Sequence, residues 1–72
     1  MHKAKMETLY VSLTATEVPG AVYRALLFEH VGSMQSLVTS FLVFPDDTME
    51  GIRETALASA VRHGYSRVRM EE

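Results

Sequence analysis

Residues 21–31 read Ala-Val-Tyr-Arg-Ala-Leu-Leu-Phe-Glu-His-Val, and the way in which this stretch folds decides the architecture of the chain. As a strand it is apolar on both faces, which is typical of a strand that is covered on two sides. As a helix it would have Pro19 in its first turn and Gly32 at its C-cap. Such a helix would be apolar all round and would have to be buried on every side, for which 72 residues leave little room. We therefore favour a strand and keep a helix as the alternative.

Two further strands are expected on either side of this stretch. Residues 6–17 alternate between polar and apolar side chains and are rich in Thr, Tyr and Val, which predicts a half-buried strand. Pro19 and Gly20 form the preferred central pair of a type II turn, so a hairpin should follow it. After a second turn at residues 31–34, residues 35–44 form another strand. One side of that strand is expected to carry Leu37, Thr39, Phe41 and Val43, and the other Val38, Ser40, Leu42 and Phe44.

A helix is expected over residues 48–63, after Pro45 has ended the third strand. Asp47 is expected to cap its N-terminus, with Glu50 three residues later to complete a capping box. Gly64 supplies a left-handed residue that ends the helix, and residues 65–70 alternate once more as a short last strand. The buried side of the helix should carry Met49, Ile52, Ala56, Ala60 and His63.

These elements predict an α+β fold in a single domain over residues 1–72, with residues 1–5 flexible. The expected order is a three-stranded antiparallel meander, one packed helix and a short C-terminal strand, β-β-β-α-β. The order becomes β-α-β-α-β if residues 21–31 are helical. Neither order carries a function by itself, because small α+β folds serve many purposes.

The composition of the chain excludes several classes of protein. It has no cysteine, which rules out disulfides, thiolate metal sites and a cysteine nucleophile. No uninterrupted apolar run exceeds the four residues of Phe41–Phe44, whereas a membrane-spanning helix needs about 20. The first residues are basic but lack the apolar core of a signal peptide, so a cytoplasmic location is expected. A formal net charge of −2 argues against a general nucleic-acid binder.

The sequence offers no recognisable catalytic or metal-binding motif. No two of the three histidines have a metal-ligand spacing, and the isolated glycines form no phosphate-binding loop. Ser59 and His63 are one helical turn apart, but they lack an orienting carboxylate and an oxyanion loop. We therefore expect no enzyme activity, no cofactor and no metal.

The C-terminal third is locally basic although the chain is acidic. Residues 51–70 contain four arginines against one acidic residue, Glu54. Arginine makes planar paired hydrogen bonds with phosphate and with carboxylate groups, so a cluster here could contact either kind of partner. Charged side chains also protect a free sheet edge from aggregation, which is the simpler explanation. The candidate contact residues for a partner or a phosphate are Arg62, Tyr65, Arg67 and Arg69.

The chain has more apolar sheet surface than one helix can cover. Residues 21–31 and 35–44 are apolar on two faces, and a single helix packs against only one of them. A second copy of the chain is the simplest cover for the other face, so we expect a homodimer. The expected partner or dimer contacts are Leu26, Phe28, Leu42 and Phe44.

Two functions are compatible with these features. The first is a small non-enzymatic protein-interaction module that acts as a regulator, adaptor or inhibitor through a sheet face or edge. Phage or mobile-element inhibitors of the anti-CRISPR type are one class with this profile, being short, mildly acidic and free of motifs. The alternative is a small nucleic-acid-binding module that uses the C-terminal arginines with Tyr65 or Tyr10.

Overall fold

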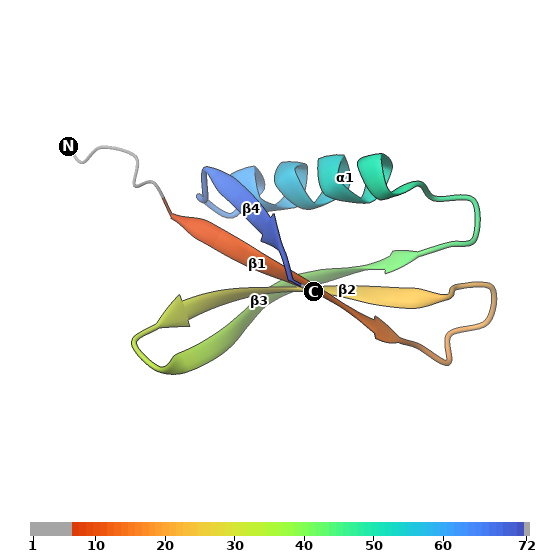
Figure 1. The fold of residues 1–72 in the computed structure, drawn as a ribbon, viewed down its shortest axis with the longest axis horizontal. Helices are drawn as coiled ribbons and strands as arrows, with labels where there is room; N and C mark the ends of the chain where they lie inside the picture. The colour runs from red at the N-terminus through yellow and green to blue at the C-terminus, as the bar shows by residue number, and fades with distance from the viewer. Residues whose placement is uncertain (1–6, 72) are drawn as a thin grey trace.

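A computed structural model describes residues 7–71 of the chain (Figure 1). Its elements are β1 (Thr8–Ala15), β2 (Tyr23–Val31), β3 (Met34–Val43), α1 (Met49–Arg62) and β4 (Arg67–Met70). The order β-β-β-α-β is therefore confirmed, and the helical alternative for residues 21–31 is wrong. The flexibility expected for residues 1–5 lies outside the described residues.

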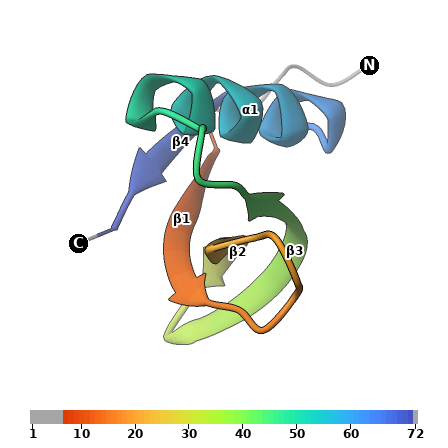
Figure 2. The ribbon, with the colours of Figure 1, turned by 90° about the vertical axis from the view of Figure 1, so that its right-hand side faces the viewer.

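The four strands form one sheet in the order β3-β2-β1-β4. β1 pairs with β2 and β2 pairs with β3, both antiparallel, as a meander requires. β4 returns beside β1 and runs parallel to it, with Leu9 opposite Val68. α1 lies against one face of this twisted sheet (Figure 2). The long strand β3 and the short strand β4 are therefore the two edges of the sheet.

Both tight turns of the meander depend on glycine. Ala21 N–H donates to the Val18 carbonyl at 3.1 Å, and Gly20 has φ of 88°, as the third position of a type II turn requires. Val31 and Met34 face each other across a two-residue loop in which Gly32 has φ of 64°. Because Ser33 has no positive φ, this loop matches a type II′ hairpin turn.

Both ends of α1 are capped, but the N-terminal cap is not the expected residue. Thr48 is the N-cap, and its hydroxyl accepts from the Gly51 N–H at 3.0 Å. The prediction of Asp47 was wrong because its carboxylate instead accepts from the Phe44 N–H at 2.7 Å and closes the preceding turn.

At the C-terminal end, Gly64 adopts the expected left-handed conformation, with φ of 92°. The N–H of Tyr65 reaches the Ala60 carbonyl at 2.9 Å, and the N–H of Gly64 reaches that of Val61 at 3.0 Å. These two bonds define a Schellman motif, which ends the helix and turns the chain toward β4.

The core lies between α1 and the face of the sheet that the helix covers. The sheet contributes Leu9, Val11, Ala25, Leu27 and Val43, and the helix contributes Ile52, Ala56 and Ala60. Two small alanines let the helix backbone lie close to the sheet. Met49 and His63 were expected on this buried side but are exposed, because they stand at the two ends of the helix, beyond its buried stretch.

A β-bulge in β3 changes which of its side chains face the core. Leu27 lies opposite Thr39, but the next residue, Phe28, lies opposite Leu37, so Val38 is an extra residue in β3. Val38 packs against the core, and Leu37 shares the face of Phe28. The expected alternation of residues 35–44 is thus wrong before the bulge, because an inserted residue inverts the faces of the strand.

Candidate functional site

The face of the sheet opposite α1, here called the open face, is its most distinctive surface. Strand alternation places Leu26 and Phe28 of β2 and Leu42 of β3 on it, and all three are only half-buried. The helix covers the other face, which carries the buried Ala25 and Leu27 of the same strand. The expected excess of apolar sheet surface is therefore present, and the described residues leave it uncovered.

Side chains on the open face form rows that cross the strands, and the most aromatic of these is here called the central row. Phe28 lies opposite Tyr10 on one side and opposite Leu37 on the other. Leu37 is 56% exposed, a high value for a leucine in a ten-residue strand. The members of the central row, from β4 to β3, are Arg69, Tyr10, Phe28 and Leu37.

Phe44 does not lie on the open face with the other three expected contact residues. It follows the end of β3, is 45% exposed, and lines a groove of about 400 Å³ between β3 and the start of α1. Phe41, Leu42 and Ile52 supply further apolar walls of this groove, here called the edge groove, and Asp47, Glu54 and Thr55 supply polar ones. Leu26 and Phe28 thus lie on the open face, Phe44 lies in the edge groove, and Leu42 borders both surfaces.

The expected arginine cluster is also divided. Arg67 and Arg69 are exposed on the open face, where they lie opposite Thr8 and Tyr10 of β1. Val68 and Met70, which alternate with them, pack against the core. Arg62 is exposed in the last turn of α1, on the other side of the sheet.

Tyr65 is held in an interaction of its own. Its hydroxyl donates to the Glu29 carboxylate at the end of β2. This hydrogen bond, with burial and the charges of Glu29 and Glu7, raises the pKa of Tyr65 to about 12. The phenol therefore ties the loop after α1 to β2, and its hydroxyl does not serve as a free contact for a phosphate.

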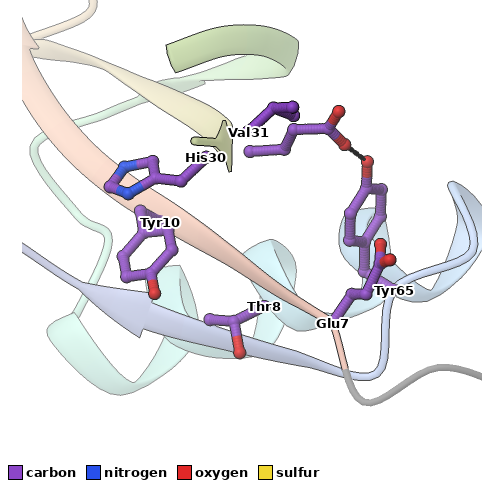
Figure 3. Close-up of a pocket in the computed structure, with 7 residues that line it drawn as sticks. Glu7, Thr8, Tyr10, His30, Val31 and Tyr65 are labelled. Atoms are coloured by element: carbon purple, nitrogen blue, oxygen red, sulfur yellow. Dashed lines mark hydrogen bonds between the residues drawn. The ribbon is translucent and has the colours of Figure 1, made fainter. Parts of the chain in front are cut away.

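A pocket of about 330 Å³ opens beside this contact, just beyond the last paired residues of β1 and β2 (Figure 3). The rings of Tyr10 and His30 stack on one side of it, with centroids 4.0 Å apart and planes 14° from parallel. The Gln35 side-chain amide is hydrogen-bonded to His30 Nε2 at 3.2 Å. Stacking on Tyr10 and the contact with Gln35 thus hold the His30 ring beside the central row.

No arrangement for metal binding is found within residues 7–71, where no three His, Asp or Glu side chains gather around one point. The Ser59 and His63 pair makes a structural contact only, in which His63 Nδ1 donates to the Ser59 carbonyl at 2.9 Å. None of the helices in the described part is both long enough and apolar enough to cross a membrane.

Leu37 and His30 were missed as surface residues of interest. Leu37 was assigned to the opposite face because an alternating pattern does not reveal a bulge. His30 was not predicted to contribute to this face, although its position two residues after Phe28 places both on one face of a strand.

No protein-family model matches this chain, and neither a curated protein nor a solved structure shows a significant similarity to it.

Proposed function

We propose that this chain is a small non-enzymatic protein-interaction module that acts as a regulator, adaptor or inhibitor through the open face and the edge of its sheet. The observation that carries the proposal is the group Leu26, Phe28 and Leu42, half-buried on a sheet face that nothing in the described residues covers. Burying a fully exposed side chain of this kind contributes about 1.5–3 kcal/mol. Covering the part of each half-buried side chain that is still exposed contributes a fraction of that value, so a partner gains affinity by covering the group. The cytoplasmic location expected from the sequence stays a prediction.

The arrangement of residues on the open face resembles that of a protein interface. Leu26 and Phe28 stand on β2, an inner strand of the sheet. Arg67 and Arg69 stand on the outer strand β4, so cations lie at the rim of the apolar group. An apolar centre with a polar rim is the usual anatomy of specific interfaces, and arginine is enriched in them. Ser12 and Ser40, small neighbours of Leu26 on both sides, leave that leucine accessible to a partner.

A charge in the middle of the open face should abolish this docking. We expect Phe28→Glu to weaken the partner at least about 30-fold, because central aromatic contacts are worth about 2 kcal/mol or more and the new carboxylate must be desolvated. The wild-type chain, immobilised, would capture the partner from a lysate of its source cell, and the purified partner would then be titrated against each variant. Val61→Glu is the matched control, since Val61 is 59% exposed on α1. Equal affinities of the two variants would refute docking on the open face.

Single-stranded nucleic acid is the second candidate, and the central row favours it. Tyr10 and Phe28 are adjacent aromatic side chains on the two inner strands, with Arg69 beside Tyr10. Bases stack on exposed aromatic rings of a sheet while cations contact the phosphates. The formal net charge of −2 makes this candidate the weaker one.

A titration of a fluorescent single-stranded oligonucleotide at low salt tests the second candidate. Binding should weaken steeply with salt, and replacing both Arg67 and Arg69 by alanine should lower the salt slope by roughly 1.4. That value corresponds to two lost phosphate contacts on a single strand. Absence of binding at about 50 µM protein would discard nucleic acid as the partner.

A further inference from the structure

The two edges of the sheet differ in how they are protected against pairing with another strand. β4 has only four residues and carries two arginines. β3 has ten residues, Met34 to Val43, with no charged side chain and no proline among them. Natural sheets usually protect a long edge with charges, proline or a covering element. Apart from the bulge at Val38, β3 has no such protection, and its residues 34–37 are all exposed.

We propose that the occupant of this edge is a second copy of the chain, whose β3 pairs antiparallel with the first to make one continuous eight-stranded sheet. The inference rests on the proposed function, because it names the partner at the sheet edge. Antiparallel pairing of identical strands about a twofold axis is self-complementary, so one strand sequence serves both sides of the interface. The absence of charge on β3 removes the repulsion that two copies of an acidic chain would otherwise experience there.

The acidic residues near β3 select the antiparallel direction. Asp46, Asp47, Glu50 and Glu54 all follow the C-terminal end of β3, in the turn and the first part of α1. A parallel pair would place the acidic groups of both copies side by side. An antiparallel pair places each group beside the start of the partner's β3, where Met34 and Gln35 are uncharged. Like charges are then kept at opposite ends of the interface.

The shape of the edge fits the same arrangement. Met34 is 69% exposed and lies on the helix side of the sheet, as does its register partner Val31. In a continuous antiparallel sheet, both helices lie on the same side, and Met34 of each copy comes beside the edge groove of the other. The apolar part of that groove is formed by Phe41, Phe44 and Ile52, and a flexible methionine side chain is well suited to pack against it. Each copy thus supplies one projecting side chain and one groove.

The bulge is compatible with this pairing. Val38 and Thr39 lie in the middle of β3, and the twofold axis would pass between them if the strands overlap completely. Residues 34–37 of each copy would then pair with residues 40–43 of the other, one segment on each side of the bulge.

Sedimentation velocity of the full chain is the first test. Between about 1 and 100 µM the mass should rise from the 8.1 kDa of one chain to twice that value. Leu37→Lys should raise the dimer dissociation constant at least about tenfold, because it places a charge on the edge strand of each copy. Val61→Lys is the matched control, since the two side chains are 56% and 59% exposed. A mass of one chain at the highest concentration, or equal effects of the two variants, would overturn self-pairing.

An engineered disulfide provides a test that does not depend on a destabilising charge. The double variant Met34→Cys with Phe44→Cys cannot close within one chain, because ten strand residues separate the two positions by roughly 33 Å. Self-pairing predicts a disulfide-linked dimer on mild oxidation, with a yield several times that of Val61→Cys with Phe44→Cys. Equal yields would contradict it.

These outcomes separate the inference from the proposed function. A chain that stays monomeric but loses its captured partner in Phe28→Glu keeps the proposed function and overturns self-pairing. A chain that dimerises through β3, but whose captured partner binds Phe28→Glu as well as wild type, supports self-pairing and refutes docking on the open face.

Discussion

Replacing Leu27 by alanine is expected to lower the free energy of unfolding by about 2–5 kcal/mol. Leu27 is fully buried on the inner strand β2, between its neighbours in the sheet and α1. The substitution removes three carbon atoms from a close-packed site and leaves a cavity that the flanking strands cannot close. A domain of this size is stabilised by only about 5 kcal/mol, so a large part of the molecules should be unfolded at 37 °C. Urea unfolding followed by far-ultraviolet circular dichroism measures the loss.

Leu57→Ala is the control for this prediction. Leu57 is 42% exposed on α1, outside the core, and alanine is a better helix former than leucine. We expect its effect to stay within about 0.5 kcal/mol, as for most surface substitutions. Similar losses for the two variants would mean that Leu27 does not lie at the sheet–helix interface.

Replacing Ala56 by aspartate is expected to lower the free energy of unfolding by about 3 kcal/mol or more at pH 7. The Ala56 side chain is fully buried where α1 meets the sheet. A carboxylate there would lose its hydration without gaining an opposite charge, and the larger side chain would also force the helix away from the sheet. Ala58→Asp, two residues along the same helix at an exposed position, should cost less than about 1 kcal/mol. Thermal unfolding of the two variants at pH 7 makes the comparison.

The cost of Ala56→Asp should also depend on pH, and the sign of the dependence identifies its cause. Burial raises the pKa of the new carboxyl in the folded state above its unfolded value of about 3.9. The folded state then binds the proton more tightly than the unfolded state, so the loss of stability grows as pH rises from about 4 to 7. Repeating the thermal unfolding at pH 4 should recover part of the loss. If the loss of stability is the same at pH 4 and pH 7, the whole effect comes from steric overpacking and not from the buried charge.

Local patterns were sufficient to predict the elements of this fold. Alternation identified the first and the last strand, and the pair Pro19 and Gly20 correctly located the first turn. Residues 21–31 were favoured as a strand because a helix there would be apolar all round. Gly64 correctly marked the helix end, because a left-handed residue there is compatible with few side chains. These features depend on residues that are close in sequence, so they can be inferred without knowing what packs against them.

Features that depend on competition between nearby groups were predicted less well. Asp47 and Thr48 are both good capping residues, and the choice between them depended on the turn that brings the Phe44 N–H to the Asp47 carboxylate. The bulge at Val38 likewise leaves no mark in the alternation of residues 35–44. It inverted the face assigned to Leu37, and with it one member of the central row.

The candidate contact residues were only partly placed by the sequence. Leu26, Phe28 and Leu42 share the open face, as strand alternation indicates. Phe44 was separated from them because β3 ends before it. Arg62 and Tyr65 were separated from Arg67 and Arg69 because α1 and β4 belong to different layers of the fold. Residues that are close in sequence can therefore lie on opposite sides of the sheet.

By itself, the sequence determined the elements, their order and the fact that one helix faces a sheet with two apolar sides. Those properties follow from side-chain periodicity and turn chemistry, which act over a few residues. Only the tertiary structure decided that β4 returns parallel to β1, because strand partners are selected by long-range packing. That one pairing makes β3 the free edge and places Arg69 beside Tyr10 on the open face.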